Sequence, residues 1–106
     1  MRKIINRKAY DTNTAEELGI WTNGYSPRDF GYTEETLFRK KTGEYFIYGF
    51  GGPRSKYAKR IADGYTGGEM IIPMTQDESE IWAEEHLTTE EYETIFGEAE
   101  EYLPFQ

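Results

Sequence analysis

The chain of 106 residues offers few side chains that could carry catalytic chemistry. It contains no cysteine, which excludes disulfides, thiolate nucleophiles and cysteine-based zinc sites. His86 is the one histidine. We expect it at the end of an acidic helix, where the helix dipole favours a cation, so a helix-end charge explains it better than a catalytic base. No serine stands in a Gly-x-Ser-x-Gly motif. The sequence therefore does not predict an enzyme.

Two further patterns suggest phosphate or metal binding. The glycine-rich segment 49–53 lacks the Gly-Lys-Thr/Ser ending of a phosphate-binding loop, so a turn or a close backbone approach explains it better. The acids between positions 77 and 85 could hold Mg²⁺ for phosphodiester cleavage, since a helix would place Glu80 and Glu84 on one face. A solvated helix face has the same pattern. We therefore expect neither a metal nor a cofactor.

The charge of the chain is divided between its two halves. All 12 lysines and arginines lie in residues 1–60 together with seven acids, whereas residues 61–106 contain 13 acids and no lysine or arginine; the net charge is −8. The acidic half must repel itself, pair with the basic half or face a cationic partner. A solvated surface that keeps a small protein soluble is one reading. Docking on a protein that normally holds nucleic acid is the other.

The basic half interleaves cations with aromatic residues, a composition typical of a sheet with stacking platforms for RNA. The net charge opposes this reading, because it repels a polyanion at long range. A fold in which the aromatics form the core and the cations pair with the acidic half explains the pattern better. The candidate partner-binding or RNA-binding residues of this half are Arg39, Lys40, Lys41 and Lys56.

These side chains must be positioned by a single domain, because two cores would be too small in a chain of this length. Residues 3–10 predict a hairpin with its tip at Asn6 and Arg7, and Thr14–Leu18 predicts a short helix that Gly19 closes. Short extended pieces and turns follow over residues 20–32. Residues 35–41 and 44–50 predict an antiparallel hairpin whose second strand is central in a sheet, since both of its faces are apolar.

The rest of the chain predicts a long loop over residues 49–68, with a turn of helix at 55–61, and then an edge strand over 69–74 that contains Pro73. Two capping boxes begin at Thr75 and Thr88. They predict one helix that runs to about His86 and a second that ends at Phe96, with Gly97 as its terminator. The expected buried residues of the two helices are Ile81, Trp82, Leu87, Tyr92, Ile95 and Phe96.

The predicted fold is therefore α+β. It contains an antiparallel sheet of four or five strands, a short N-terminal helix and two C-terminal helices packed on the sheet through Trp82, Ile95 and Phe96. Residues 1–97 form the domain, and residues 98–106 form an acidic C-terminal tail. No apolar run approaches the roughly 18 residues of a membrane span, and the start is too short for a signal peptide. We expect a soluble, cytosolic protein.

Several segments together resemble a group of small acidic proteins of phages, plasmids and conjugative elements in Gram-positive bacteria. Some of that group are similar to type II-A anti-CRISPR proteins, which inhibit the RNA-guided effector nuclease. Arg7 departs from the group's pattern, where glycine is expected in the hairpin. The resemblance spans residues 3 to about 97 and lies in KIINRKAYDTNTA (3–15), ETLFRKKTGEYFIYG (35–49), GGPRSKYA (51–58), GGEMIIPM (67–74) and WAEEH (82–86).

The resemblance implies an inhibitor that acts in the cytoplasm of the bacterial host cell without catalysis. It would bind the effector nuclease, with or without its guide RNA, and interfere with guide-RNA loading or with the assembled complex. The nuclease has positively charged channels for nucleic acid, where carboxylates could compete with phosphates. The alternatives are an RNA-binding or regulatory module that uses the basic hairpin, and a metal-dependent nuclease. The candidate residues of the acidic face are Glu84, Glu85, Glu90, Glu91 and Glu93.

Overall fold

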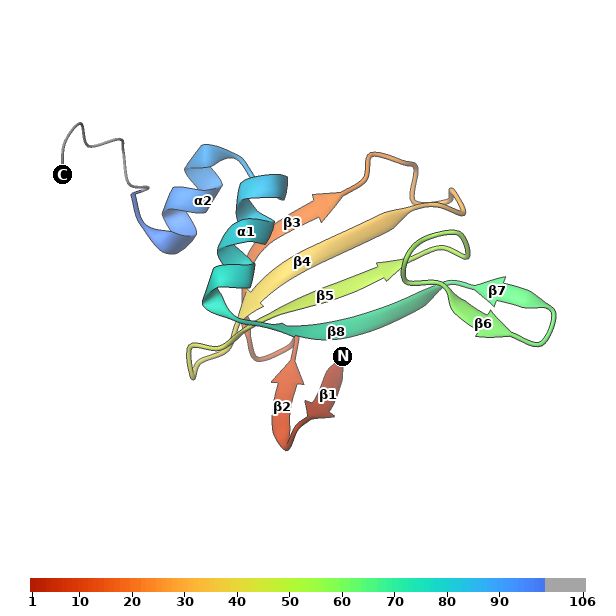
Figure 1. Cartoon of the computed structure of the whole chain (residues 1–106), viewed down its shortest axis with the longest axis horizontal. Coiled ribbons are helices and arrows are strands. Elements are labelled where there is room, and N and C mark those ends of the chain that lie inside the picture. Colours follow the sequence, from red (N-terminus) through yellow and green to blue (C-terminus); the bar gives the residue numbers. More distant parts are fainter. Residues whose placement is uncertain (99–106) are drawn as a thin grey trace.

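The computed structural model describes residues 1–98. Most of the predicted acidic tail lies outside these residues. The described part contains eight strands followed by two helices (Figure 1). In chain order these are β1 (Arg2–Ile5), β2 (Lys8–Asp11), β3 (Glu16–Thr22), β4 (Thr33–Arg39), β5 (Tyr45–Gly51), β6 (Lys59–Ile61), β7 (Gly64–Thr66), β8 (Gly68–Met74), α1 (Gln76–His86) and α2 (Thr89–Phe96).

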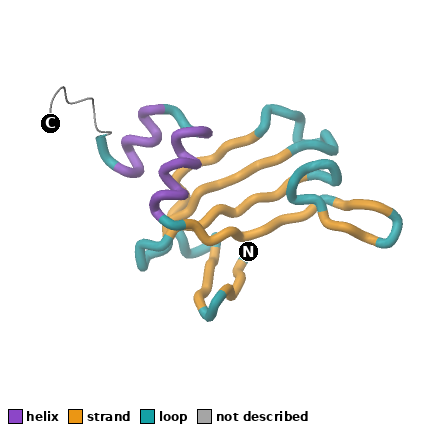
Figure 2. Tube along the Cα trace, viewed as in Figure 1, coloured by secondary structure: helices purple, strands orange, loops and turns teal. Residues whose placement is uncertain are grey.

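The centre of the fold is a four-stranded antiparallel sheet in the order β3-β4-β5-β8. The predicted hairpin of residues 35–50 forms its two central strands, and the strand with Pro73 lies at an edge, so both predictions are confirmed. The helices pack near one end of the sheet, while the β6–β7 hairpin extends from the other end (Figures 1 and 2). The predicted α+β class with two C-terminal helices is therefore confirmed.

The predicted short N-terminal helix is wrong, because residues 16–22 form edge strand β3. A helix of about five residues is too short to offset the cost of its own nucleation. As a strand, the segment pairs with β4, and Glu16 also forms an ion pair with Arg39 (Oε1 to Nη2, 2.9 Å). Gly19 does not end a helix. It faces Leu87, whose Cδ1 would lie 2.7 Å from an added Cβ atom.

The predicted N-terminal hairpin is confirmed as β1–β2, a separate two-stranded sheet. Asn6 and Arg7 at its tip have φ angles of 50° and 68°, as a two-residue primed turn requires. The hairpin packs through Tyr10, whose ring meets Phe46 edge-on at a centroid distance of 5.5 Å. Phe46 is stacked on Phe38 at 5.1 Å, and these residues form a core on one face of the sheet.

The glycine-rich region beyond β5 is partly strand. The predicted turn of helix at 55–61 is limited to one backbone hydrogen bond, from Ala58 N to Ser55 O at 3.1 Å. Residues 59–66 then form the β6–β7 hairpin, which the sequence analysis did not predict. Ala62 and Asp63 reverse the chain there, and Gly64, the first residue of β7, has a φ angle of 140° that favours glycine.

Both capping boxes are confirmed. Thr75 Oγ1 accepts from Glu78 N at 3.0 Å, and Glu78 returns the contact to Thr75 N at 2.8 Å. Thr88 and Glu91 form the same pair of contacts at 3.1 and 3.0 Å. Gly97 follows α2 with a φ angle of 92°, as predicted for its terminator. In each helix the capping box therefore provides partners for backbone N–H groups at the start, which have none within the helix.

The helices bury Trp82 and Ala83 against Leu37, Tyr45 and Ile47 of the central strands. Phe96 reaches the same core and contacts the Tyr45 ring at a centroid distance of 5.8 Å, whereas Ile95 is half-buried. The prediction that Ile81 is buried is wrong, since its side chain is 56% exposed. Ile81 lies about 100° around the helix from Trp82 and about 200° from Ala83, so a helix that turns Trp82 and Ala83 toward the sheet leaves Ile81 toward solvent.

Replacing Trp82 by alanine should lower the free energy of unfolding by about 3–5 kcal/mol, because the change leaves a cavity in the main core. The neighbouring Ile81→Ala is the matched control, and we expect it to change stability by about 0.5 kcal/mol or less. Urea unfolding followed by circular dichroism measures both. Equal losses in the two variants would contradict the packing of α1 described above.

Candidate functional site

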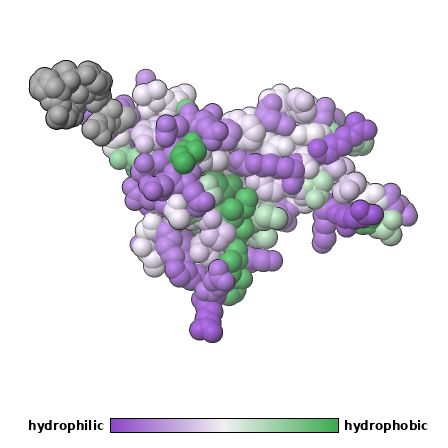
Figure 3. Space-filling model, viewed as in Figure 1, coloured by the Kyte–Doolittle hydropathy of each residue, from purple (hydrophilic) through white to green (hydrophobic). Residues whose placement is uncertain are grey.

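The five candidate carboxylates of the acidic half lie on two consecutive helices. Glu84 and Glu85 are on α1, and Glu90 and Glu91 are in the first turn of α2; all four side chains are exposed, whereas Glu93 is half-buried. Hydrophilic side chains cover much of the helical end in the view of Figure 3. We call this region of α1 and α2 the acidic helical end. The structure therefore brings the predicted acidic residues onto one end of the molecule.

Some acids of this end also have local roles. Glu91 caps α2, and Glu80 accepts from Gln76 Nε2 at 3.0 Å. Burial raises the pKa of Tyr92, and the negative charges of Glu80 and Glu84 raise it further. The carboxylates of α1 thus act on a residue of α2. Glu84, Glu85 and Glu90 are the exposed members outside the capping boxes, which makes them suited to contact a partner.

The candidate cations of the basic half are not gathered in one place. Arg39, Lys40 and Lys41 lie together at the β4–β5 turn, and Lys56 lies in the loop between β5 and β6. Lys40 forms an ion pair with Glu44 at 3.0 Å, and Lys8 reaches the same carboxylate at 2.7 Å. The hydrogen bonds from these two lysines, with that from Lys8 the stronger, lower the pKa of Glu44 to about 2.

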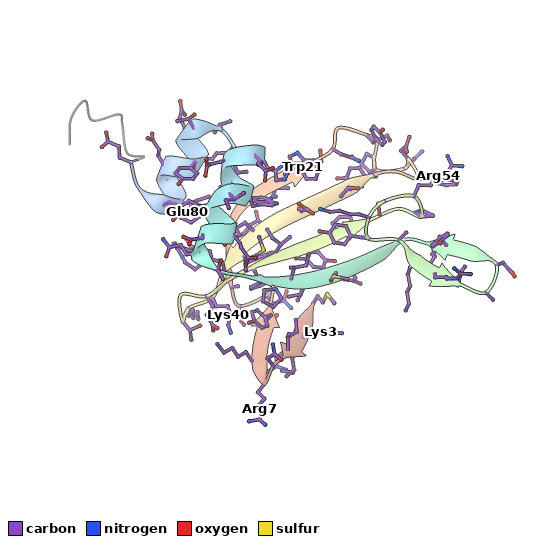
Figure 4. All side chains as sticks on the ribbon, in the orientation of Figure 1. Lys3, Arg7, Trp21, Lys40, Arg54 and Glu80 are labelled. Atoms are coloured by element: carbon purple, nitrogen blue, oxygen red, sulfur yellow. The ribbon has the colours of Figure 1, made fainter. Side chains whose placement is uncertain are left out.

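The ion pairs of the basic half use acids from that same half. The pairs already named and the long Arg2–Asp11 contact of 4.0 Å all lie within the first 60 residues. Figure 4 shows Arg7 on the N-terminal hairpin and Arg54 at the end of the sheet remote from the helices, whereas Glu80 lies on α1. These two cations lie away from α1, whereas Arg39 lies near α2: its guanidinium is 6.0 Å from the centre of the Tyr45 ring, which contacts Phe96.

The aromatic residues beside the basic turn are buried. Phe46 is fully covered, Phe38 is 5% exposed and Tyr45 is 9% exposed. A base can stack only on a ring with an accessible face. These residues belong to the two cores and do not provide the stacking platforms that an RNA-binding hairpin would need.

The most distinctive polar cluster surrounds Glu35, which the sequence analysis did not select as a site residue. Its side chain is buried on β4, and the whole residue is 2% exposed. Trp82 Nε1 donates to Oε1 at 2.8 Å, and Tyr57 Oη donates to Oε2 at 2.5 Å. Lys56 Nζ lies 2.6 Å from Oε2. The donors come from α1 and from the loop before β6, so one carboxylate joins three segments.

These contacts decide the ionisation of the cluster. Burial alone would raise the pKa of Glu35, but hydrogen bonds from Lys56, Tyr57 and Trp82 together outweigh burial and lower it. Burial, followed by the Glu35 carboxylate, raises the pKa of the Tyr57 hydroxyl well above its usual value. At neutral pH the carboxylate is therefore ionised and the hydroxyl is protonated. The cluster holds charges in place and is not poised to transfer a proton.

A signal for this cluster was present in the sequence. Glu35 alternates with Leu37 on β4, so it had to share the face of the sheet that the helices cover. Gly49 lies beside it on β5, and an added Cβ atom there would lie 2.1 Å from Cζ of Tyr57. A charged residue at an inward position and a glycine on the neighbouring strand together indicate a buried polar contact.

A cleft of about 460 Å³ lies between α1 and the sheet above this cluster. It brings together two candidate residues from opposite halves of the sequence, Glu85 and Lys56. A second groove of about 530 Å³ also includes Lys56 and continues toward Trp21 and Arg54. The Trp21 ring contacts the His86 ring at a centroid distance of 4.3 Å with the planes tilted by 37°, which joins β3 to the end of α1. The lining of the cleft is Glu35, Ile47, Lys56, Ile72, Met74, Glu78, Ile81, Trp82, Glu85 and His86.

Within residues 1–98, no group of three or more histidine or acidic side chains is arranged to hold a metal ion. In the same described range, no helix is both long and apolar enough to cross a membrane. Comparisons of the chain with family models, curated proteins and solved structures returned no match.

The Glu35 cluster predicts a specific dependence of stability on pH. Folding lowers the pKa of Glu35 below its ordinary value of 4.5. The ionised carboxylate therefore stabilises the folded state above about pH 4.5, and this stabilisation is lost as the pH falls through the pKa of the folded state. In the Glu35→Gln variant, an NH₂ group takes the place of one carboxylate oxygen. This group cannot accept a hydrogen bond, so a buried donor loses its partner. We expect this variant to lose about 1–3 kcal/mol at pH 7.

Urea unfolding at pH 7 and at about pH 3 measures this effect. The difference between the wild type and Glu35→Gln should shrink at the lower pH, because the unfolded chain then binds a proton at Glu35 and the stability due to the lowered pKa decreases. Glu17→Gln, which changes an exposed carboxylate on β3, is the control and should cost little at either pH. A Glu35→Gln difference that is the same at both pH values would contradict the charged role of Glu35.

Proposed function

We propose that the protein inhibits a type II-A CRISPR effector nuclease by direct binding, as an anti-CRISPR protein without catalytic activity. The observation that carries the proposal is the acidic helical end, where exposed carboxylates stand on two capped helices, while Lys8, Arg39 and Lys40 pair with acids of the first 60 residues. The sequence resemblance points to the same class of protein. Its place of action would be the cytoplasm of the bacterial host cell.

The partner's chemistry fits this end of the molecule. A CRISPR effector nuclease holds its guide RNA and target DNA in positively charged channels. Carboxylates fixed on capped helices can occupy cation sites that otherwise bind phosphates. Attraction between the opposite charges would speed the encounter, and its strength would fall with salt. Affinity beyond this attraction would come from apolar contacts, for which the exposed Ile81 beside the acids is available.

The same chemistry leaves two steps at which the protein could block the nuclease. A competitor of phosphate acts before guide-RNA loading if the empty channel is its target. It acts on the assembled complex if it occupies the part of the channel that receives DNA. We favour interference at one of these two steps over any chemical change of the RNA. The burial of Phe38, Tyr45 and Phe46 beside the basic turn gives the RNA-binding alternative less support.

The variant Glu84→Gln/Glu90→Gln should weaken inhibition about tenfold or more, because it removes two exposed charges without touching either capping box. The matched control Glu17→Gln/Asp63→Asn removes two exposed charges elsewhere and should inhibit like the wild type. DNA cleavage by a purified type II-A nuclease measures both, with inhibitor added before or after guide-RNA loading.

The order of addition separates the possible steps, and a gel of the guide RNA is run beside the DNA. Inhibition only before loading would indicate blocked assembly, whereas inhibition in both orders would indicate capture of the loaded complex. Shortened RNA would contradict the non-catalytic mechanism. Equal inhibition by the two double variants in folded protein would contradict docking through the acidic helical end.

A further inference from the structure

The face of the central sheet opposite the helices is only partly covered. The N-terminal hairpin packs on one part of it through Tyr10, which contacts Phe46 and belongs to the core with Phe38 and Ile71. Toward the β6–β7 end the same face remains accessible. Ile20 on this face is 48% exposed, and the neighbouring Tyr48 is only half-buried. This part of the sheet has a surface of its own, separate from the acidic helical end.

A row of three residues crosses that surface. Glu34 on β4, Phe50 on β5 and Glu69 on β8 lie directly opposite one another in the strand register. Side chains paired in this way share a face, with Cβ atoms about 4.5–5.5 Å apart. The Phe50 ring is therefore flanked by a carboxylate on each neighbouring strand.

Two tyrosines complete the arrangement and orient the carboxylates. Tyr32 Oη donates to Glu34 Oε1, and Tyr48 Oη donates to Glu69 Oε1, each at 2.7 Å. The Tyr32 and Tyr48 ring centroids lie 6.2 and 5.8 Å from that of Phe50. We call Tyr32, Glu34, Tyr48, Phe50 and Glu69 the aromatic–acidic patch.

The electrostatics of the patch favour a cation. Burial, and then the carboxylates of Glu69 and Glu34, raise the pKa of Tyr48 to about 12. Its hydroxyl therefore stays protonated and keeps donating to Glu69. Each tyrosine hydroxyl donates to Oε1 of one carboxylate. The Oε2 atom of that carboxylate has lone pairs of its own, which can accept a hydrogen bond from a partner. A phosphate would be repelled by both carboxylates, so nucleic acid does not fit this surface.

We propose that the aromatic–acidic patch binds an arginine side chain from a basic segment of a partner protein. A guanidinium is planar and can stack on the Phe50 ring while donating to the carboxylates on either side. A lysine ammonium is a compact point charge that cannot engage both carboxylates and the ring face in this way. The patch lies on an open sheet face, which suits a side chain presented by a protein segment. The inference does not require the partner to be a nuclease.

The test uses the whole protein and a fluorescent peptide in which arginine alternates with glycine, at about 150 mM salt to screen weak surface charge. Binding is measured by fluorescence anisotropy. Glu34→Gln/Glu69→Gln should weaken binding about tenfold, and Phe50→Leu should weaken it about threefold. Glu17→Gln/Asp63→Asn, which removes the same charge at exposed positions outside both the patch and the acidic helical end, should change it less than about twofold. The peptide with lysine in place of arginine should bind several-fold more weakly than the arginine peptide.

Backbone amide shifts of the wild-type protein provide a readout that does not depend on how the variants fold. As the arginine peptide is added, the amide chemical shifts of Phe50 and Glu69 should change at lower peptide concentrations than those of α1. Equal weakening by the two double variants would overturn the proposal, since the binding would then follow net charge alone. Concentration-dependent dimers that Glu34→Gln/Glu69→Gln abolishes would also overturn it and assign the patch to a second copy of the chain.

Discussion

The buried carboxylate of Glu35 joins the parts of this fold that the sheet alone would not hold together. Donors from Trp82, Tyr57 and Lys56 converge on its two oxygens. A buried charge with fewer partners would be costly, since desolvation of an unpaired carboxylate amounts to several kcal/mol. The position of α1 and the loop between β5 and β6 therefore depend on the same group. The side chain of Lys56 is 62% exposed, so water screens its charge. Lys56 therefore stabilises the Glu35 carboxylate less than the two buried donors do.

The fixed position of α1 determines where many of the acidic residues lie in the fold. Cations of the first 60 residues pair with nearby acids such as Glu16 and Glu44, and these pairs are local to the strands and turns. The carboxylates of α1 and α2 are instead displayed on capped helices. A partner with a positive surface would therefore meet a rigid array of acids. Rigid arrays lose less entropy on binding than flexible tails, which favours recognition by this end.

Local sequence signals predicted the parts of the fold that depend on local chemistry. The capping boxes at Thr75 and Thr88, the hairpin around residues 42–43 and the edge position of Pro73 all follow from neighbouring residues. The strand at residues 16–22 did not follow from its neighbours, because its paired residues on β4 run from Glu34 to Arg39 and this pairing overrides a weak helix signal. The Glu35 cluster was missed for the same reason, since Trp82 is 47 residues distant. The acidic candidates were predicted from charge alone, which located them on helices but did not reveal the aromatic–acidic patch.

Hydrogen exchange of the protein in complex with a purified type II-A effector nuclease tests the central claim most directly. The account predicts slower exchange in the peptides of α1 and α2 when the nuclease is present, with and without guide RNA compared in parallel. Loss of that protection in either state would identify the step at which the inhibitor binds. Exchange in α1 and α2 that is unchanged by both forms of the nuclease would contradict the proposal that the acidic helical end makes the contact.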